Sequence, residues 1–233
     1  MYINSNQLVT INPIGENQQK VFDAWAKEKN LFLTGSAGTG KTFVLLHLAF
    51  KAVLDKGQPY DKVVLVRSLL PSRDIGFLPG TLEEKSDLYQ DPYRILIRYL
   101  FEMPSEQGHD TLYDKLVGQG SLEFYSTSFL RGQTFDRSII IVDEASNLLF
   151  QELDTIMTRV GQNSKIMFAG DMAQSDLRKH NGDREGYHNF EAILEEMDEF
   201  EVVEFGIGDI IRSGLVRSYL IAKTNMGIRG SNA

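Results

Sequence analysis

The sequence contains no cysteine among its 233 residues. This absence excludes disulfide frameworks, zinc sites built on thiolates and cysteine nucleophiles. The sequence also lacks any apolar run approaching the roughly 18–20 residues that span a bilayer. Its first residues contain no basic segment followed by an apolar stretch, the pattern of a secretory signal. A cytoplasmic protein without a membrane partner is therefore expected, and the missing cysteines fit a reducing compartment.

The sequence also lacks a net positive charge: its formal charge is -8 and its pI is about 5.1. This balance argues against a protein that coats nucleic acid by bulk electrostatic attraction. The charge is unevenly spread, however. Residues 191–204 hold seven acids and no base, whereas the chain from Gly206 onward carries four bases against one acid. A local surface for nucleic acid remains compatible with the sequence.

Short apolar runs alternate with longer patterns of helical period along the chain. The expected strands are 31–34, 63–66, 122–126, 138–142, 165–169 and 201–205. The expected helices are 17–27, 41–54, 93–101, 148–160, 189–197 and 215–223, and a polar loop is expected at 104–110. This alternation predicts an α/β fold with a largely parallel sheet flanked by helices. We expect one domain over residues 1–226, with an insertion at about 68–120 and a flexible tail at 227–233.

Residues 35–42, GSAGTGKT, match the phosphate-binding pattern G-x-x-x-x-G-K-[ST] (Walker A) in full. The glycines let backbone N–H groups turn inward around a phosphate, and the following helix adds its positive N-terminus. Lys41 is expected to reach the β- and γ-phosphates, and the Thr42 hydroxyl to ligate Mg²⁺. The motif lies between a predicted strand and a predicted helix, as it must. The expected nucleotide-binding residues of this segment are Gly35, Ser36, Ala37, Gly38, Thr39, Gly40, Lys41, Thr42 and Phe43.

Two acids directly follow the apolar run 138–142. Asp143 is expected to hold the metal through its water shell, and Glu144 to polarise the attacking water as general base. The alternative is that the pair only caps a helix. Beside a complete phosphate loop, we favour the catalytic interpretation.

Two further polar positions follow later strands. Gly170-Asp171 ends the run at 165–169, and Gln174 lies where an amide could sense the γ-phosphate, although a strand followed by Gly-Asp is also a common turn. Arg212 follows the last strand. A guanidinium often supplies charge to the transition state of nucleotide hydrolysis, and the alternative is an ordinary surface arginine.

Together these motifs resemble those of PhoH-like proteins, ATPases related to the motor core of superfamily-one helicases. The resemblance covers about residues 17–223. Besides the phosphate loop it rests on Arg67, GFLPGTLEEK at 76–85, RGQTF at 131–135, the IIIVDEAS run, Gly170-Asp171 with Gln174, and IRSGLV at 211–216. In length, the chain looks like the short versions found in bacteriophages, which would place it in the host cytoplasm.

The resemblance implies a RecA-like P-loop NTPase fold with ATP and Mg²⁺ as ligands. It implies Gln18 as the reader of adenine, with Gln19 as the alternative. It also implies a ring of identical subunits, expected to be a hexamer, with nucleotide at subunit boundaries. Whether Arg212 acts on its own or a neighbour's ATP is left open, and Arg178 is a second candidate for the latter role.

This sequence departs from the family pattern in places. Ser213 replaces the histidine of most cellular members. Only about 30 residues precede the phosphate loop, too few for the N-terminal nuclease domain of some relatives. A second RecA-like domain is not expected, so unwinding by a single subunit is not expected either.

The expected function is Mg²⁺-dependent ATP hydrolysis coupled to action on RNA or single-stranded DNA. Possible nucleic-acid contacts are Arg67, Arg73 and Arg131, with Phe77, Tyr125, Phe129 and Phe135 among them as stacking surfaces. The alternative is that the aromatic side chains belong to the core and the arginines pair with Glu83 and Glu84.

An alternative function is that of a nucleotide-gated assembly protein with slow hydrolysis. A small-molecule kinase lacks support, because GFLPG-x-LEEK has no such use.

Overall fold

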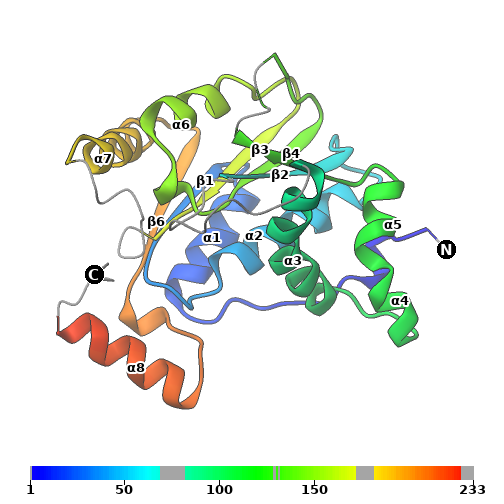
Figure 1. The fold of residues 1–233 in the computed structure, drawn as a ribbon, viewed down its shortest axis with the longest axis horizontal. Coiled ribbons are helices and arrows are strands. Elements are labelled where there is room, and N and C mark those ends of the chain that lie inside the picture. Colours follow the sequence, from blue (N-terminus) through cyan, green and yellow to red (C-terminus); the bar gives the residue numbers. More distant parts are fainter. Residues whose placement is uncertain (1, 69–81, 128–129, 131, 172–180, 227–233) are drawn as a thin grey trace. The chain divides into compact units, whose positions relative to one another are not determined.

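The computed structural model describes residues 2–68, 82–127, 130, 132–171 and 181–226, without the side chains of 82–88, 181–184 and 224. Its six strands form one sheet in the order β3-β2-β4-β5-β1-β6, flanked by helices (Figure 1). Strand β1 pairs in parallel with β5 and β6, and β2 pairs in parallel with β3. The predicted α/β fold with a parallel sheet is confirmed.

The chain divides into two compact units. The first unit comprises Met1–Ile11, Leu45–Ile141 and Thr155–Lys165, and the second comprises Asn12–Val44, Val142–Asp154 and Ile166–Ala233. The single domain over 1–226 stays a prediction, and the predicted tail at 227–233 lies outside the described residues. None of the described helices is both long and apolar enough to cross a bilayer.

The first unit is built around two outer strands and the helices of the expected insertion. Two aromatic contacts join its parts. The rings of Phe50 and Phe101 meet edge to face at 5.5 Å, and those of Tyr93 and Phe124 lie 6.0 Å apart. Its elements are most of α2 (Lys41–Val53), β2 (Lys62–Arg67), α3 (Leu82–Leu100), α4 (Glu106–Asp110), α5 (Leu112–Gly118), β3 (Leu122–Ser126), most of β4 (Ser138–Val142) and the end of α6 (Phe150–Met157).

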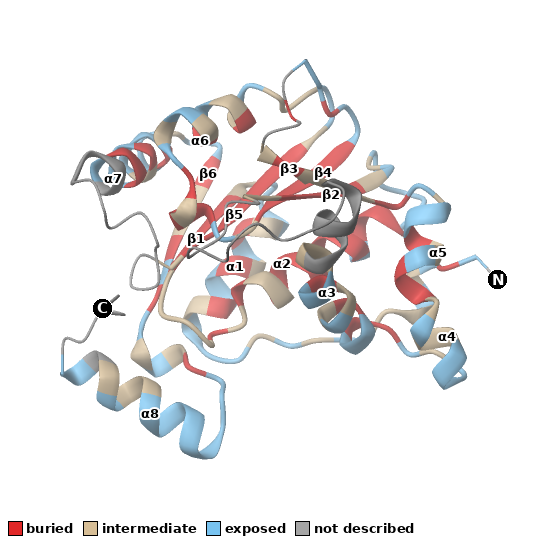
Figure 2. Ribbon diagram, viewed as in Figure 1, coloured by how far each residue is buried: buried red, intermediate tan, exposed pale blue. Residues whose placement is uncertain are grey.

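The second unit holds the phosphate loop. An aromatic cluster lies in its core, where the Phe168 ring lies 5.8 Å from Phe32 and 5.3 Å from Phe190. Figure 2 colours the buried residues of the ribbon red. Helices α1 and α7 both pack on β6. Its elements are α1 (Glu16–Ala26), β1 (Asn30–Gly35), the start of α2 (Lys41–Val53), the start of α6 (Phe150–Met157), β5 (Lys165–Ala169), α7 (Asn181–Glu195), β6 (Phe200–Phe205) and α8 (Gly214–Asn225).

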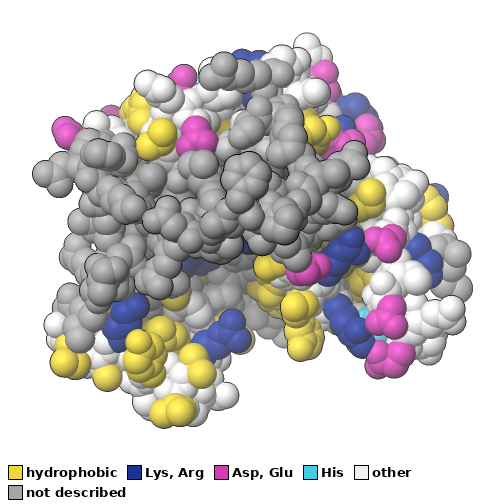
Figure 3. All heavy atoms as spheres, in the orientation of Figure 1, with side chains coloured by type: hydrophobic (Ala, Val, Ile, Leu, Met, Phe, Trp, Pro, Cys, Tyr) yellow, Lys and Arg dark blue, Asp and Glu magenta, His cyan; other side chains and the backbone are white. Residues whose placement is uncertain are grey.

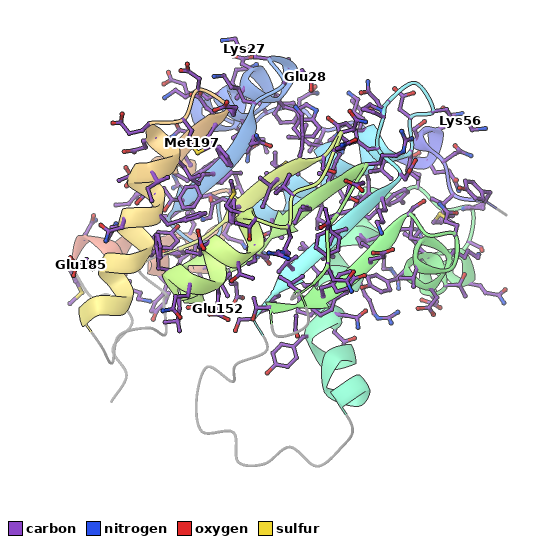
Figure 4. The ribbon with its side chains drawn as sticks, turned by 90° about the horizontal axis from the view of Figure 1, so that it is seen from above. Lys27, Glu28, Lys56, Glu152, Glu185 and Met197 are labelled. Carbon is purple, nitrogen blue, oxygen red and sulfur yellow. The ribbon has the colours of Figure 1, made fainter. Side chains whose placement is uncertain are left out.

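The register of β1 and β6 sets which residues meet at the loop. Asn30 is opposite Phe200 at one end of the pair, and Gly35 is opposite Phe205 at the other. The turns that lead into the two strands lie at the first of these ends, where Figure 4 labels Lys27, Glu28 and Met197. The phosphate loop therefore leaves from the opposite, carboxyl end.

Most expected strands and helices are confirmed within a few residues, but the polar loop at 104–110 is wrong. That segment contains α4, whose first turn is capped by Ser105, since its side-chain oxygen accepts a hydrogen bond from the Gly108 N–H at 3.1 Å. Gly108 inside the helix lowers its intrinsic propensity, which hides it from pattern reading. Helix α5 was not expected at all.

Two helices begin earlier than expected, and α6 is shorter than expected. Helix α3 begins at Leu82 and continues through Pro92, although proline favours a helix start at its own position. Helix α7 begins at Asn181, well before 189. Its Gly186 lies against Phe150, and an added Cβ would come 3.0 Å from the Phe150 Cβ. Close packing on α6 explains this glycine, which weakens the helical pattern in sequence.

His47 is a buried histidine of α2, only 3% exposed, and its Nδ1 has no hydrogen-bond partner among the described residues. Burial, and to a lesser extent the positive charge of Lys51, lower the pKa of His47 from 6.5 to about 4. The unfolded chain therefore binds a proton near pH 6.5, whereas the folded chain binds it only near pH 4. We expect the free energy of unfolding to fall as pH drops through this window, by about 2 kcal/mol between roughly pH 7.5 and pH 5.

Urea unfolding of the wild type and His47→Leu at both pH values measures this contribution. The leucine variant should lose about 2 kcal/mol less than the wild type on acidification. Leu48→Ala, at a buried residue of the same helix that does not titrate, is the control and should keep the wild-type dependence. Equal losses in the wild type and His47→Leu would contradict the prediction.

Candidate nucleotide-binding site

The phosphate loop leaves β1 at Gly35, in a position where only glycine fits. Its φ is +99°, and an added Cβ would lie 2.1 Å from the carbonyl oxygen of Phe205 on β6. The next residue is tied to the same carbonyl, because the Ser36 N–H donates to the Phe205 oxygen at 2.8 Å. The carboxyl end of β6 thus fixes where the loop begins.

Two further glycines give the loop its shape. Gly38 and Gly40 have φ of +75° and +82°, in the left-handed region that side chains disfavour. The Gly40 carbonyl accepts from the Val44 N–H at 3.0 Å, so the loop enters the first turn of α2. The predicted context of strand, loop and helix is confirmed, and Phe43 lies half-buried in that first turn.

The Lys41 ammonium lies inside this loop. It donates to the carbonyl oxygens of Gly35 and Ser36 at 2.9 and 2.8 Å. Burial lowers the pKa of Lys41, and the carboxylates of Asp171 and then Asp143 oppose that shift. The two carboxylates therefore help to keep charged an ammonium that burial partly withdraws from water.

The first turn of α2 meets the acidic pair after β4. The Thr42 hydroxyl donates to Asp143 Oδ1 at 2.8 Å, which brings together the two residues expected to hold the metal. Glu144 follows at φ +51° and ψ +40° and is exposed. Its Oε2 accepts from the Asn147 side-chain amide at 3.2 Å, and its own side chain caps no helix N–H.

The end of β5 joins the same site. Asp171 lies near Lys41, as the influence of its carboxylate on the Lys41 pKa indicates. Its backbone is bonded to the Ser146 hydroxyl, at the turn that carries Asp143 and Glu144. The predicted γ-phosphate sensor, Gln174, lies outside the described residues, as does Arg178.

Gln18 and Gln19 of α1 differ in placement. Gln18 is 4% exposed, its side-chain amide donates to the Thr39 carbonyl at 3.1 Å, and its Oε1 accepts from the Ile14 N–H at 2.8 Å. Gln19 is exposed and bonds Asp23 of its own helix at 2.8 Å. Of the two, only Gln18 contacts the phosphate loop.

The segment after β6 crosses the loop. The Ile211 N–H donates to the Gly38 carbonyl at 3.1 Å, and the Ile211 side chain covers Gly40. The Arg212 stem lies against Gly38, with its Cγ 3.0 Å from where a Cβ would stand. Arg212 therefore lies beside the loop of its own chain.

The three arginines expected to contact nucleic acid are only partly described. Arg67 ends β2, with its guanidinium 5.9 Å from the centre of the Tyr93 ring. Arg73 and Arg131 lie outside the described residues, as do Phe77 and Phe129. Phe135 is 3% exposed and packs edge to face on Tyr125 at 5.2 Å, so the core alternative holds for Phe135.

Sequence reading assigned no role to two residues that the structure brings to this site. Ser146 ends the IIIVDEAS run, and the only sequence feature that suggests a role for it is a hydroxyl close to the acidic pair. Tyr187 gave no signal, because its burial between the ends of β1 and β5 appears only in three dimensions. The described residues contain no group of three or more metal-ligating side chains.

The PhoH-like protein family matches residues 10–223. This chain belongs to that family. The PhoH-like protein of Mycobacterium leprae is 34% identical over 208 residues, and protein PhoH of Escherichia coli K12 is 31% identical over 210. Each match covers 89% of this chain and 56% of the relative, so the chain spans little more than half the length of these relatives.

A solved structure supports the fold of this PhoH-like chain. The large terminase of a thermophilic bacteriophage, in complex with ADP, superposes with a TM-score of 0.53 at 12% identity. The likeness covers 91% of this chain and 50% of the terminase. The family match confirms the expected resemblance, and this likeness supports the expected RecA-like fold.

We expect Gly35→Ala to unfold more easily than any glycine replacement that only strains φ. Gly120→Ala is the matched control, because Gly120 has φ of +76° but nothing within 4 Å of an added Cβ. Strain at positive φ costs about 1–3 kcal/mol, and the clash with Phe205 adds to it at Gly35 alone. Urea unfolding at neutral pH measures both variants. If the two variants lose the same free energy of unfolding, the close approach of β6 to Gly35 is contradicted.

Proposed function

We propose that this chain is a Mg²⁺-dependent ATPase whose hydrolysis is coupled to RNA or single-stranded DNA. The observation that carries the ATPase proposal is the 2.8 Å contact between Thr42 Oγ1 and Asp143 Oδ1. It brings a hydroxyl from the phosphate loop and a carboxylate from a different strand to one point. In P-loop NTPases this pair holds the magnesium of the bound triphosphate.

The donor set at this point fits Mg²⁺. The ion prefers oxygen ligands and usually keeps several waters, through which Asp143 would hold it while the Thr42 hydroxyl binds it. It is usually held by one or two protein oxygens together with phosphates and water, which agrees with the lack of a larger ligand cluster among the described residues. Bound there, the ion would neutralise charge on the phosphate oxygens.

Each remaining residue has a role that its position supports. Lys41 would leave the carbonyls of Gly35 and Ser36 to contact the β- and γ-phosphates. Glu144, exposed beside Asp143, would orient water and accept its proton. Gln18 would read adenine, and its bond to the Thr39 carbonyl would connect the base to the loop. Arg212, against Gly38, would supply positive charge. Gln174, which lies outside the described residues, is kept from the sequence as the proposed γ-phosphate sensor.

Action on nucleic acid rests on the family and on Arg67. Arg67 ends β2, and ligands of parallel sheets bind at the carboxyl ends of strands. Arginine there can contact a phosphate backbone, and an aromatic partner such as Tyr93 keeps its guanidinium plane oriented. Arg73 and Arg131 remain part of this proposal. The buried Phe135 does not.

We expect the purified chain to release phosphate from ATP only with Mg²⁺ present. Lys41→Ala should lower kcat at least about 100-fold by removing charge from the transition state, and Glu144→Gln similarly by removing the base. Glu144→Gln should keep nucleotide affinity, whereas Lys41→Ala should lose it. Lys51→Ala on α2 and Glu185→Gln on α7 (labelled in Figure 4) are controls expected to match the wild type.

The same assay with RNA and single-stranded DNA tests the coupling. Stimulation that weakens with salt, and that Arg67→Ala reduces, supports action on nucleic acid. No stimulation by either polymer would contradict the coupling but not the ATPase. ATP binding with negligible turnover in the wild type would favour the alternative, a nucleotide-gated assembly protein.

We further propose that the chain associates with copies of itself, as a ring of six subunits. Helix α8 supports this, because none of its described side chains is buried (Figure 2). Leu215, Val216 and Tyr219 are 85%, 53% and 63% exposed, and Figure 3 shows apolar and basic side chains together there. A helix of twelve residues needs packing to be stable in water.

Charge favours a second copy as the partner of α8. The chain from Gly206 onward carries four bases against one acid, whereas 191–204, at the end of α7 and along β6, holds seven acids and no base. The two charged segments belong to the same compact unit. Contact of one with the other in a neighbouring copy is head to tail, the kind of contact that closes into rings.

We expect Leu215→Ser with Tyr219→Ser to shift the chain toward single copies, because the change removes apolar surface from the interface. Light scattering and sedimentation over a range of concentration and salt measure this. Ile95→Ser with Tyr99→Ser, at an equally exposed apolar pair on α3, is the control and should leave assembly unchanged. A wild type of single-chain mass throughout would refute self-association.

A further inference from the structure

Ser146 forms an unusual pair of hydrogen bonds. Its hydroxyl donates to the Asp171 carbonyl oxygen at 3.1 Å and accepts from the Asp171 N–H at 3.1 Å. The residue is 3% exposed, so water competes little for these bonds. One side chain therefore holds both backbone polar groups of Asp171.

The turn that carries Ser146 is short and stiff. It is a 3₁₀ turn over Ala145–Asn147 that begins at Glu144, and the Asn147 N–H donates to the Glu144 carbonyl at 2.9 Å. Glu144 itself is left-handed at φ +51°, a conformation that persists only where neighbouring contacts enforce it. A bond made by Ser146 thus restrains the proposed general base two residues earlier.

The strand end on the other side of these bonds is also restrained. An added Cβ at Gly170 would lie 3.1 Å from the Ser146 nitrogen and 2.6 Å from the Tyr187 hydroxyl, so this end of β5 is packed on both sides. Tyr187 is fully buried, and its hydroxyl donates to Thr34 Oγ1 at 3.4 Å. Burial raises the pKa of Tyr187, which keeps this donor protonated at neutral pH.

These contacts form one continuous path across the site. It runs from the acidic turn through Ser146 to Asp171, then from Gly170 through Tyr187 to Thr34. Thr34 directly precedes Gly35, where the phosphate loop begins. The path therefore connects the residues proposed for metal and water with the loop proposed for phosphate.

We propose that Ser146 is a positioning residue of this site, whose hydroxyl sets the spacing between the Asp143–Glu144 turn and Asp171. The proposal rests on the proposed ATPase function. Asp171 lies close enough to Lys41 for its charge to act on the ammonium, so a shift of its backbone would change the field around the phosphates. Without the hydroxyl, both the acidic turn and Asp171 lose a fixed reference, whereas the phosphate loop keeps its own hydrogen bonds to Lys41 and to β6.

The test is the split between turnover and binding in Ser146→Ala. We expect kcat for ATP to fall about 10-fold or more, while KM and the Kd of a fluorescent ATP analogue change less than about 3-fold. Ser146→Thr, which restores the hydroxyl, should recover kcat to within about 3-fold of the wild type. Hydrogen exchange at the Asp171 amide should become faster in Ser146→Ala alone.

Ser164→Ala is the matched control. The Ser164 hydroxyl likewise accepts from a backbone N–H, that of Ser138 at 3.0 Å, and donates to a backbone carbonyl, that of Phe135 at 2.7 Å. It lies at the amino ends of β4 and β5, away from the carboxyl ends that carry the site. The Ser164→Ala variant should lower the midpoint of thermal unfolding as Ser146→Ala does, but it should leave kcat unchanged.

The outcomes separate this inference from the proposed function. An unchanged kcat in Ser146→Ala, or an equal loss in Ser164→Ala, would overturn the positioning role and leave the ATPase standing. If Ser146→Thr does not fold, the exchange rate of the Asp171 amide in Ser146→Ala decides, and an unchanged rate overturns the proposal. A wild type without ATPase would overturn the proposed function, and this inference with it.

Discussion

The structure of the site depends on the close approach of β6 to the point where β1 ends. The Phe205 carbonyl accepts from the Ser36 N–H and leaves no room for a side chain on Gly35. This single contact fixes the direction in which the chain leaves the sheet. Because α2 begins only six residues later, it also fixes where Lys41 and Thr42 lie. The parallel pairing of β1 with the edge strand β6 thereby fixes the start of the phosphate loop.

A lysine and two carboxylates of opposite charge lie close together at the phosphate loop. The Lys41 ammonium, partly desolvated, has the carboxylates of Asp171 and Asp143 near it and the carbonyls of Gly35 and Ser36 in contact. Withdrawing the ammonium from water costs free energy, and the two carboxylates and two carbonyls partly offset that cost. Hydroxyl groups rather than further charges hold it in place, namely those of Thr42, Ser146 and Tyr187. Neutral donors can fix carboxylates and backbone without adding to the local field.

Sequence reading located the loop, the acidic pair and nearly all strands, because each depends on local pattern or on a motif with fixed spacing. It failed where tertiary packing overrides propensity. Gly186 weakens the pattern of α7 but permits close contact with Phe150, and Gly108 weakens the pattern of α4, whose first turn Ser105 caps. It could not find Ser146 or Tyr187, since a serine in a turn and a tyrosine in a helix carry no mark of the strand ends they join. Sequence reading also could not choose between Gln18 and Gln19 as the residue that contacts the loop, because the choice depends on how far each side chain is buried and on its hydrogen-bond partners.

The segment that follows β6 connects the exposed helix α8 to the phosphate loop. Ile211 donates to the Gly38 carbonyl, and Leu220 of α8 reaches the same glycine, with its Cδ1 3.3 Å from where a Cβ would stand. Gly38 belongs to the stretch whose backbone would surround a phosphate. Ile211 and Leu220 therefore join the phosphate loop to α8, a helix none of whose described side chains is buried. If α8 meets a neighbouring copy, each subunit would sense its neighbour through the backbone of its own phosphate loop.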